Sequence, residues 1–170
     1  MRLVSLLVAL LFFIPPISSY GLSEAYRNSV GKNLNLIKQK STAYVWGAAG
    51  VEKDGVLQVD CSGMLHYLYK LSGIPVRRVT AKDMRYGLGG WIGKDVSLDD
   101  VDHLDIIWWS WRSVPANKRR EHGHVGLLAE DPRTKLIEAV HASGSKGKVV
   151  SQQVSGVLLR DISALRRITI

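Results

Sequence analysis

The first half of the chain carries the apolar spacing of amphipathic helices. Across residues 22–37, apolar side chains recur at every third or fourth position, which places them on one face of a helix. Ser23 suits the start of that helix. A second helix is predicted at 61–71, because Ser72-Gly73 would end it. A shorter third helix is predicted at 80–88.

In the second half of the chain, apolar and polar residues alternate as in β-strands, and turn-forming residues separate these stretches. Turn-forming residues at 130–134 would join two of the strands as a hairpin. Helices followed by neighbouring strands predict the α+β class, with the N-terminal helices packed on one side of an antiparallel sheet. The stretch 46–55 is predicted to be a loop. The predicted strands lie at about 105–110, 123–129, 135–142, 147–153 and 166–170.

The tryptophan-rich stretch 108–111 divides between the two faces of its strand. Side chains alternate along a strand, so Trp109 and Trp111 share one face and Trp108 lies on the other. At least one of these faces is therefore predicted to be core, and Trp109 or Trp111 is the candidate for a cleft wall.

Residues 1–19 have the anatomy of a secretory signal peptide. Arg2 supplies a positive charge, an almost unbroken apolar run covers 3–14, and small residues at 18–19 offer a cleavage point. The run is short for a membrane span, and an uncleaved anchor is the alternative. Cleavage would leave a single domain of residues 20–170 that is secreted or periplasmic, with no stable membrane insertion.

The composition fits one globular domain with a partner of opposite charge. The chain has 170 residues, enough for one core, and its 46% hydrophobic and 22% charged residues are ordinary for a globular protein. The formal charge of +8 suits an acidic polymer such as nucleic acid, anionic lipid or cell wall. Because the basic residues are scattered, a solvated basic face is favoured over a dedicated basic patch. No nucleic-acid motif accompanies the charge, so no nucleic-acid partner is expected. A monomer without a cofactor is expected.

Cys61 is the only cysteine in the chain, and its surroundings suit a nucleophile. It would lie in the first turn of the second predicted helix, directly after Asp60 as the N-cap. Unpaired backbone amides and the positive end of the helix dipole would there favour the thiolate over the thiol. A lone cysteine cannot form an internal disulfide, which is notable in an exported protein. The alternative is a buried small hydrophobe, since free cysteine is among the most buried residue types.

Two histidines fall on the two strands of the predicted hairpin. His124 lies in 123–129 and His141 in 135–142, and both are expected to face the helix that begins with Cys61. A cysteine, a histidine base and a second polar residue that orients the base form the cysteine version of a catalytic triad. For either histidine taken alone, a structural role is the alternative.

The spacing of His122 and His124 leaves a second interpretation open. Two residues apart on a strand, their imidazoles would share one face, and His141 could complete a three-histidine zinc site. That arrangement leaves Cys61 without a role, so the sequence favours thiol chemistry without a metal.

Several short elements, in order, resemble those of the NlpC/P60 cysteine peptidases, which cut the peptide stems of bacterial cell walls. The resemblance covers about 44–150 and implies a papain-like NlpC/P60 fold. Its elements are Tyr44-Val45-Trp46-Gly47-Ala48, Asp60-Cys61-Ser62-Gly63-Met64-Leu65, Ile74-Pro75-Val76-Arg77-Arg78, Asp105-Ile106-Ile107-Trp108-Trp109, Gly123-His124-Val125-Gly126 and Val140-His141-Ala142.

The resemblance also assigns roles. It implies that Cys61 is the nucleophile, that His124 is the general base and acid, and that His141 orients His124. Tyr44 and Ser62 would belong to the substrate or oxyanion site. Peptidoglycan peptides would be the substrates and peptide-bond hydrolysis the reaction. A papain-like N-acetylmuramoyl-L-alanine amidase and a non-catalytic wall-binding domain are the alternatives.

The chain departs from the family's pattern in two backbone positions. Ala48 stands where the opening element has its second glycine, and Leu104 stands where a glycine precedes the strand aspartate. Both positions bear on loop geometry more than on chemistry. The stretch 108–121 is also longer and more basic than is usual in the family, so substrate specificity is the least transferable property.

Overall fold

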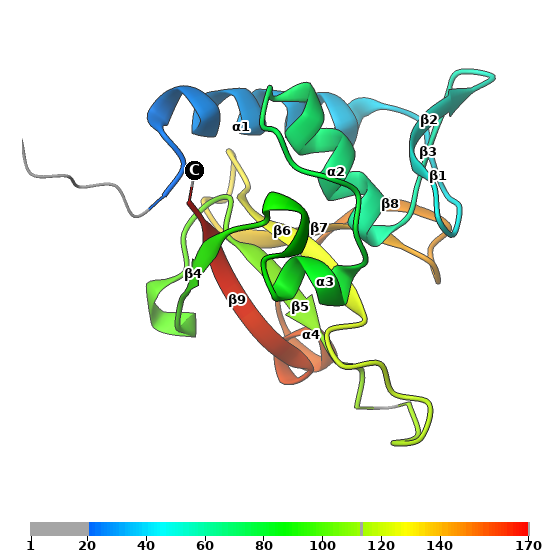
Figure 1. The fold of residues 1–170 in the computed structure, drawn as a ribbon, viewed down its shortest axis with the longest axis vertical. Helices are drawn as coiled ribbons and strands as arrows, with labels where there is room; N and C mark the ends of the chain where they lie inside the picture. Colours follow the sequence, from blue (N-terminus) through cyan, green and yellow to red (C-terminus); the bar gives the residue numbers. More distant parts are fainter. Residues whose placement is uncertain (1–20, 113, 170) are drawn as a thin grey trace, which may run out of the picture.

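The computed structural model describes residues 21–112 and 114–169, so the predicted signal peptide lies outside the described residues. Three of the helices belong to the first half of the chain (Figure 1). None of the helices in the described ranges is long and apolar enough to cross a membrane. The helices are α1 (Glu24–Gln39), α2 (Cys61–Leu71), α3 (Ala81–Arg85) and α4 (Gly156–Arg160), with 3-10 turns at Leu88–Gly90 and Leu98–Asp100.

In the described part of the chain the strands form two sheets. The small sheet has the order β1-β3-β2, built from β1 (Thr42–Tyr44), β2 (Ala49–Lys53) and β3 (Val56–Val59). The main sheet has the order β4-β9-β5-β6-β7-β8, and each neighbouring pair in it is antiparallel. Its strands are β4 (Gly93–Asp95), β5 (Ile106–Trp109), β6 (His124–Glu130), β7 (Ile137–Ser143), β8 (Lys148–Gln153) and β9 (Ile162–Ile168).

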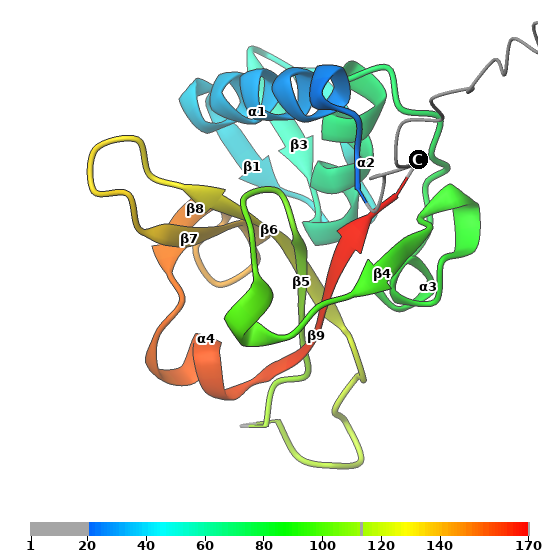
Figure 2. The ribbon, with the colours of Figure 1, turned by 90° about the vertical axis from the view of Figure 1, so that its left-hand side faces the viewer.

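The two faces of the main sheet are covered by different elements. Figure 2 shows α1 and α2 on one side of it and α4 on the other. Leu34 of α1 and Leu65 of α2 belong to the same buried cluster as Val125 of β6. Trp109 of β5 belongs to a second cluster on the opposite face, where Leu158 of α4 packs against it. The α+β class is confirmed, but α4 places one short helix on the second face.

Several element boundaries differ from those predicted. Helices α1 and α2 and strands β5 to β8 lie within a few residues of their predictions. The stretch 46–55, predicted to be a loop, contains β2, whose side chains are half-buried or exposed and so lack an apolar run. The third helix ends at Arg85, because Gly87 takes a left-handed φ of 77°. Strand β9 begins at Ile162 instead of 166.

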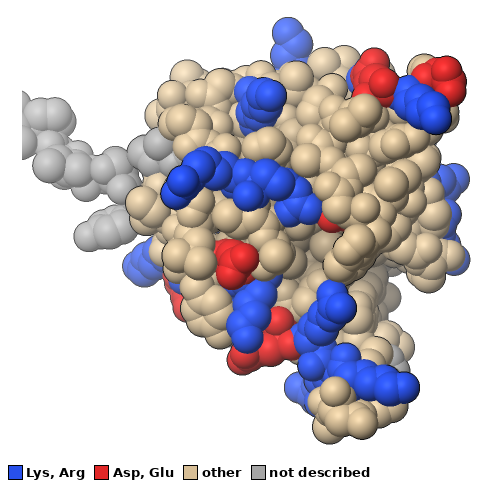
Figure 3. All heavy atoms as spheres, turned by 45° about the vertical axis from the view of Figure 1, so that its right-hand side comes forward, with Lys and Arg blue, Asp and Glu red and all other residues tan. Residues whose placement is uncertain are grey.

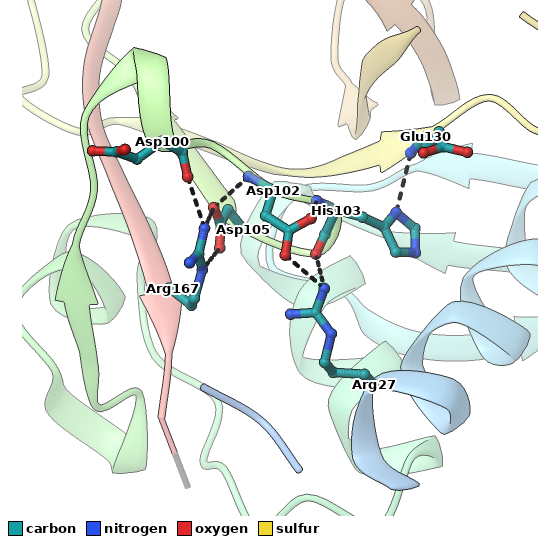
Figure 4. A network of polar contacts seen from close by, with 7 residues as sticks. All are labelled: Arg27, Asp100, Asp102, His103, Asp105, Glu130 and Arg167. Carbon is teal, nitrogen blue, oxygen red and sulfur yellow. Dashed lines mark hydrogen bonds and ion pairs between the residues drawn. The ribbon is translucent and has the colours of Figure 1, made fainter. Parts of the chain in front are cut away.

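A network of ion pairs fastens the C-terminal strand and α1 to the start of β5 (Figure 4). The guanidinium of Arg167 donates to both carboxylate oxygens of the buried Asp105, each at 2.9 Å. Arg27 of α1 donates to the Asp102 carboxylate at 2.9 Å and to the carbonyl of His103 at 3.0 Å. The aspartate of the family-like 105–109 element therefore has a structural role, because removing one partner of a buried ion pair is strongly destabilising.

Leu104 occupies a backbone conformation that glycine adopts more easily. Its φ is 75°, in the left-handed region, and its side chain is buried. The glycine of the family's pattern is thus replaced without loss of the backbone turn. The packing of the Leu104 side chain compensates for the conformational cost.

Candidate active site

Cys61 is the first residue of α2, and Asp60 caps the helix as predicted. The Asp60 carboxylate accepts a hydrogen bond from the N–H of Gly63 at 2.6 Å and another from the N–H of Gly47 at 2.9 Å. The cap therefore joins the helix to the loop after β1, so that the cysteine is held between the two.

The glycine of the Asp-Cys-Ser-Gly segment is required by a close backbone approach. A Cβ atom at Gly63 would lie 1.9 Å from the carbonyl oxygen of Ala48. That same carbonyl accepts a hydrogen bond from the N–H of Asp60 at 3.0 Å, which fixes the loop against the helix start. Only glycine leaves room for this contact beside Cys61.

Arg78 completes the support of the cysteine turn, a role that the sequence did not reveal. Its guanidinium donates to both oxygens of the Asp60 carboxylate, at 2.6 and 2.8 Å, and to the Ser62 hydroxyl at 2.6 Å. The Ser62 hydroxyl in turn donates to Asp60 at 3.2 Å. The Ser62 side chain is thus engaged with this buried network, while its backbone N–H points at the Cys61 sulfur.

The two candidate histidines form a direct hydrogen bond, as their places on neighbouring strands predict. His124 Nε2 lies 2.8 Å from His141 Nδ1, with the rings almost perpendicular at 88°. His141 Nε2 lies 3.0 Å from Oε1 of Gln152 on β8, a residue that the sequence analysis did not single out. Both histidine side chains are buried, with 9% and 3% of their surface exposed. The polar chain runs across three strands of the main sheet.

Gly126 makes room for this pair. A Cβ atom at that position would lie 3.0 Å from the Cβ of His141 and 3.2 Å from the indole of Trp109. The nearest atom is the backbone carbonyl oxygen of Val140, at 2.9 Å. The second glycine of the Gly-His-Val-Gly segment therefore has a steric purpose, because a side chain there would displace β7 beside His141.

The histidines lie on a different face of the sheet from the one expected. His124 alternates with Val125, which packs towards α2, and the rings of His124 and His141 contact Trp109 on the opposite face at 5.4 and 5.5 Å between centroids. Trp111 stacks on Trp109 and lies 5.6 Å from His124, so the predicted pairing of these two tryptophans is confirmed.

Cys61 lies beside the start of β6, the strand that carries His124. The backbone N–H of Val125, the residue after His124, points at the Cys61 sulfur. Among the contacts of residues 21–112 and 114–169, no hydrogen bond joins Cys61 to the His124 ring itself. Cys61 borders one cavity and His124 a second, and both cavities share Trp46 and Gly123 as walls. The cavity of Cys61 and the cavity of the histidine pair are therefore adjacent.

Tyr44 lies beside the cysteine turn at the end of β1. Burial, assisted by the nearby Cys61 and Asp60, raises the pKa of Tyr44 to about 12. Its hydroxyl is therefore protonated at neutral pH and can donate a hydrogen bond. Tyr44 borders the same cavity as His124 and His141.

His122 does not share a strand face with His124. It precedes β6 with a φ of 49°, in the left-handed region, and its Nδ1 lies 2.8 Å from the Ser163 hydroxyl. In the described ranges, no group of three or more histidine, cysteine or acidic side chains is arranged to hold a metal ion. The three-histidine zinc arrangement is therefore wrong in its geometry, because His122 turns away before the strand begins.

Solved structures decide what this architecture is. An NLP/P60-family protein from Staphylococcus aureus, described as similar to a lipoprotein, matches with a TM-score of 0.63 at 18% identity, over 93% of this chain and 46% of that one. NlpC1 from Trichomonas vaginalis matches with a TM-score of 0.59 at 20% identity, over 83% of this chain and 44% of that one. The protein has the NlpC/P60 fold. The chain spans less than half the length of these two proteins.

A third structure with the NlpC/P60 fold has a different description. RipD from Mycobacterium tuberculosis, described as a non-catalytic domain adapted to peptidoglycan binding, matches with a TM-score of 0.54 at 16% identity, over 84% of this chain and 96% of that one. The sequence itself matches no family model and no curated protein. The NlpC/P60 fold is thus compatible with catalysis and with binding alone, and the site must distinguish them.

Cys61 is held as a thiol, not as the thiolate that its helix position predicted. Burial, and next the negative charge of Asp60, raise the pKa of Cys61. The N–H groups of Val125 and Ser62 and the charge of Arg78 lower it, but by less. The expectation was wrong because desolvation of a buried thiolate outweighs the favourable amides at the helix start.

The two histidines of the candidate site are neutral as well. Burial, with a smaller contribution from His141, lowers the pKa of His124 to about 3. Burial also lowers the pKa of His141, although its hydrogen bond to Gln152 acts in the opposite direction. At neutral pH the resting site therefore holds an uncharged thiol and two uncharged imidazoles.

These buried histidines predict that acid weakens the fold. Below the unfolded pKa near 6.5, the unfolded chain binds a proton at residue 124, whereas the folded chain does so only near pH 3. Between these limits we expect His124 to lower the free energy of unfolding by ~1.4 kcal/mol per pH unit. Urea unfolding at pH 7, 5 and 4 measures this slope. The His124→Asn variant should lose stability less steeply, and an equal slope in both proteins would contradict the assignment.

The cavity beside Cys61 has a basic wall. It has a volume of about 580 Å³ and borders Trp46, whose ring lies 5.3 Å from the guanidinium of Arg120. Lysine and arginine side chains are spread over the face drawn in Figure 3, with fewer acidic ones between them. The cationic residues of the wall are Arg78, Lys82, Arg119 and Arg120, and its acidic residues are Asp60 and Glu121. The wall favours a ligand with negative charge.

Proposed function

We propose that the protein is a cysteine peptidase that hydrolyses peptide bonds in peptidoglycan stem peptides. The observation that carries this proposal is the hydrogen-bonded pair of His124 and His141, buried in the sheet where the backbone N–H of Val125 acts on the sulfur of Cys61. A protein that only binds the wall needs neither a cysteine at a helix start nor a hydrogen-bonded histidine pair beside it. The NlpC/P60 fold supports a role at the cell wall.

The reaction would begin from the uncharged thiol. Because burial disfavours a separate thiolate and imidazolium, Nδ1 of His124 takes the proton of Cys61 while the sulfur attacks. Nε2 of His124 is already engaged with His141. The sulfur attacks the peptide carbonyl and forms a tetrahedral oxyanion, which backbone amides at the start of α2 and the Tyr44 hydroxyl would stabilise. His124 then gives the proton to the departing amine, leaving an acyl-enzyme.

Water completes the cycle through the same histidine. His124 accepts a proton from a water molecule, the hydroxide attacks the acyl carbonyl, and the thiol is restored as the acid product leaves. Catalytic hydrogen bonds are often long in ligand-free enzymes and shorten when substrate binds. A bound peptide is therefore expected to lie across the two adjacent cavities and to bring Cys61 and His124 into hydrogen-bond distance.

Digestion of purified peptidoglycan tests the proposal. We expect soluble fragments whose masses show a cut between two amino acids of the stem peptide. Iodoacetamide should abolish their release, and a metal chelator should leave it unchanged. Fragments cut between sugar and peptide would show an amidase instead. Activity lost to the chelator and restored by zinc would contradict the cysteine mechanism.

A second candidate is wall binding without hydrolysis, because RipD combines this fold with a non-catalytic description. In that case the protein would co-sediment with insoluble peptidoglycan and release no fragments over a long digestion. The Cys61→Ala variant would then bind with unchanged affinity, because nothing in binding alone requires the sulfur.

We also propose that the chain is exported and acts outside the cytoplasm as a monomer. The charged and apolar composition of residues 1–19 supports this, and a wall substrate requires it. N-terminal sequencing of secreted or periplasmic protein should find a start near Tyr20. Protein that retains Met1 and is extracted only with detergent would show an anchored form instead.

A further inference from the structure

Gln152 is the outermost member of the buried polar chain, and the sheet register explains how it reaches the histidines. His141 of β7 lies opposite Val150 of β8, and Gln152 follows two residues later on the same face. Its side chain thus extends along the diagonal and places Oε1 at 3.0 Å from Nε2 of His141. No other described partner of that nitrogen competes with Gln152 in this position.

We propose that Gln152 is a positioning residue that sets the tautomers of His141 and, through it, of His124. In the structure the amide of Gln152 turns its oxygen, and not its nitrogen, towards His141. In this orientation the carbonyl oxygen only accepts a hydrogen bond, so Nε2 of His141 carries the proton. A neutral imidazole has one N–H, and His141 therefore presents a bare Nδ1 to its neighbour.

The same reasoning applies to the ring of His124. Because Nδ1 of His141 can only accept, Nε2 of His124 must donate across their 2.8 Å contact. The single proton of neutral His124 is then fixed on Nε2, and its Nδ1 keeps a free lone pair. Burial lowers the pKa of both histidines, so each ring is neutral and the argument holds at pH 7.

Without the acceptor of Gln152, the hydrogen bond between His141 and His124 could also run in the opposite direction. His141 could carry its proton on Nδ1 and donate to His124, whose own proton would then move to its Nδ1. That nitrogen could no longer accept the proton of Cys61, so the pair would be present but inactive. The amide of Gln152 thus acts on a reaction that it does not touch. This step rests on the proposed function, whereas the tautomers themselves do not.

Three variants separate the effect of the acceptor from that of packing. Gln152→Glu keeps an acceptor of the same length, Gln152→Met keeps the length without an acceptor, and Gln153→Met is the control on the neighbouring exposed position. Gln152 is half-buried near the end of β8, and Gln152→Ala provides a second acceptor-free variant that needs no new packing. Circular dichroism and thermal unfolding establish that each variant is folded.

The primary measurement is the state of the imidazole nitrogens, observed by long-range ¹H–¹⁵N correlation spectra on ¹⁵N-histidine protein. We expect the Nε2–H form at both His124 and His141 in the wild type, in Gln152→Glu and in Gln153→Met. In Gln152→Met and Gln152→Ala we expect a mixture that includes the Nδ1–H form. Unchanged Nε2–H forms in both acceptor-free variants would overturn the proposal, whatever the protein hydrolyses.

Kinetics provide the second measurement. We expect Gln152→Met to lower kcat about tenfold to 100-fold with little change in KM, and Gln152→Glu to restore most of it. A wild type without hydrolytic activity would reject the proposed function, while the spectra would still decide the role of Gln152. Equal loss in Gln152→Glu and Gln152→Met would show that packing matters instead of the acceptor, and would overturn the proposal.

Discussion

The Cys61→Ala variant is expected to fold normally and to lose peptidoglycan hydrolysis by a factor on the order of 10⁴ or more, because removing a catalytic nucleophile typically costs several orders of magnitude in rate. The turn around the cysteine should survive, since its hydrogen bonds come from Asp60, Gly63 and Arg78 and not from the sulfur. Loss of the buried sulfur should lower the free energy of unfolding by only about 1 kcal/mol. Fragment release and urea unfolding measure the two quantities.

Ser62→Ala is the matched control, because it removes a side-chain oxygen one residue away. It breaks the contacts of the Ser62 hydroxyl with Asp60 and Arg78 but leaves the thiol and the backbone amides in place. We expect a lower stability and a moderate loss of rate. A folded Cys61→Ala protein with turnover near that of the wild type would reject the nucleophile assignment.

The second large effect is a difference in kcat between variants of the two histidines. His124→Ala removes the group that moves the proton and should lower kcat on the order of 10³-fold or more. His141→Asn should retain partial activity, because its amide oxygen can still accept the hydrogen bond from Nε2 of His124. The distinction follows from the 2.8 Å contact between the rings and from the neutral state of both.

His103→Gln is the control for this pair, because it changes a histidine at a different place in the fold. His103 accepts a hydrogen bond from the N–H of Glu130 at 3.0 Å and has no contact with the histidine pair. The kcat of the His103→Gln variant should equal that of the wild type. An inactive His141→Asn variant beside an active His124→Ala variant would reverse the assigned roles.

Much of the fold follows from local patterns in the sequence. The apolar period places α1 and α2, and the alternation at 108–111 correctly separates Trp108 from Trp109. The small sheet could not be predicted in the same way, because β1 to β3 are short and β2 is largely exposed. In such strands the pairing partner, and not the residue pattern, determines the structure.

The candidate site was predictable in its residue types but not in its electrostatics. Local sequence indicates that Cys61 starts a helix, but whether its thiol ionises depends on burial by segments far along the chain. Arg78 belongs to the family-like element at 74–78, but its contact with Asp60 could not be read from that element, and Gln152 belongs to no such element. Their contacts arise only when the loop after α2 and strand β8 are in place. The face on which the histidines lie likewise depends on strand register, which a shift of one residue would reverse.

The raised pKa of Cys61 has a consequence for the lifetime of the molecule. Oxidants such as peroxide attack thiolates and react slowly with thiols, and access to the sulfur limits them further. With its proton retained and 5% of its surface exposed, the Cys61 side chain should resist conversion to sulfenic acid and to mixed disulfides. The burial and the Asp60 charge that delay ionisation would therefore preserve the single cysteine of the chain in the oxidising environment that the proposed export implies.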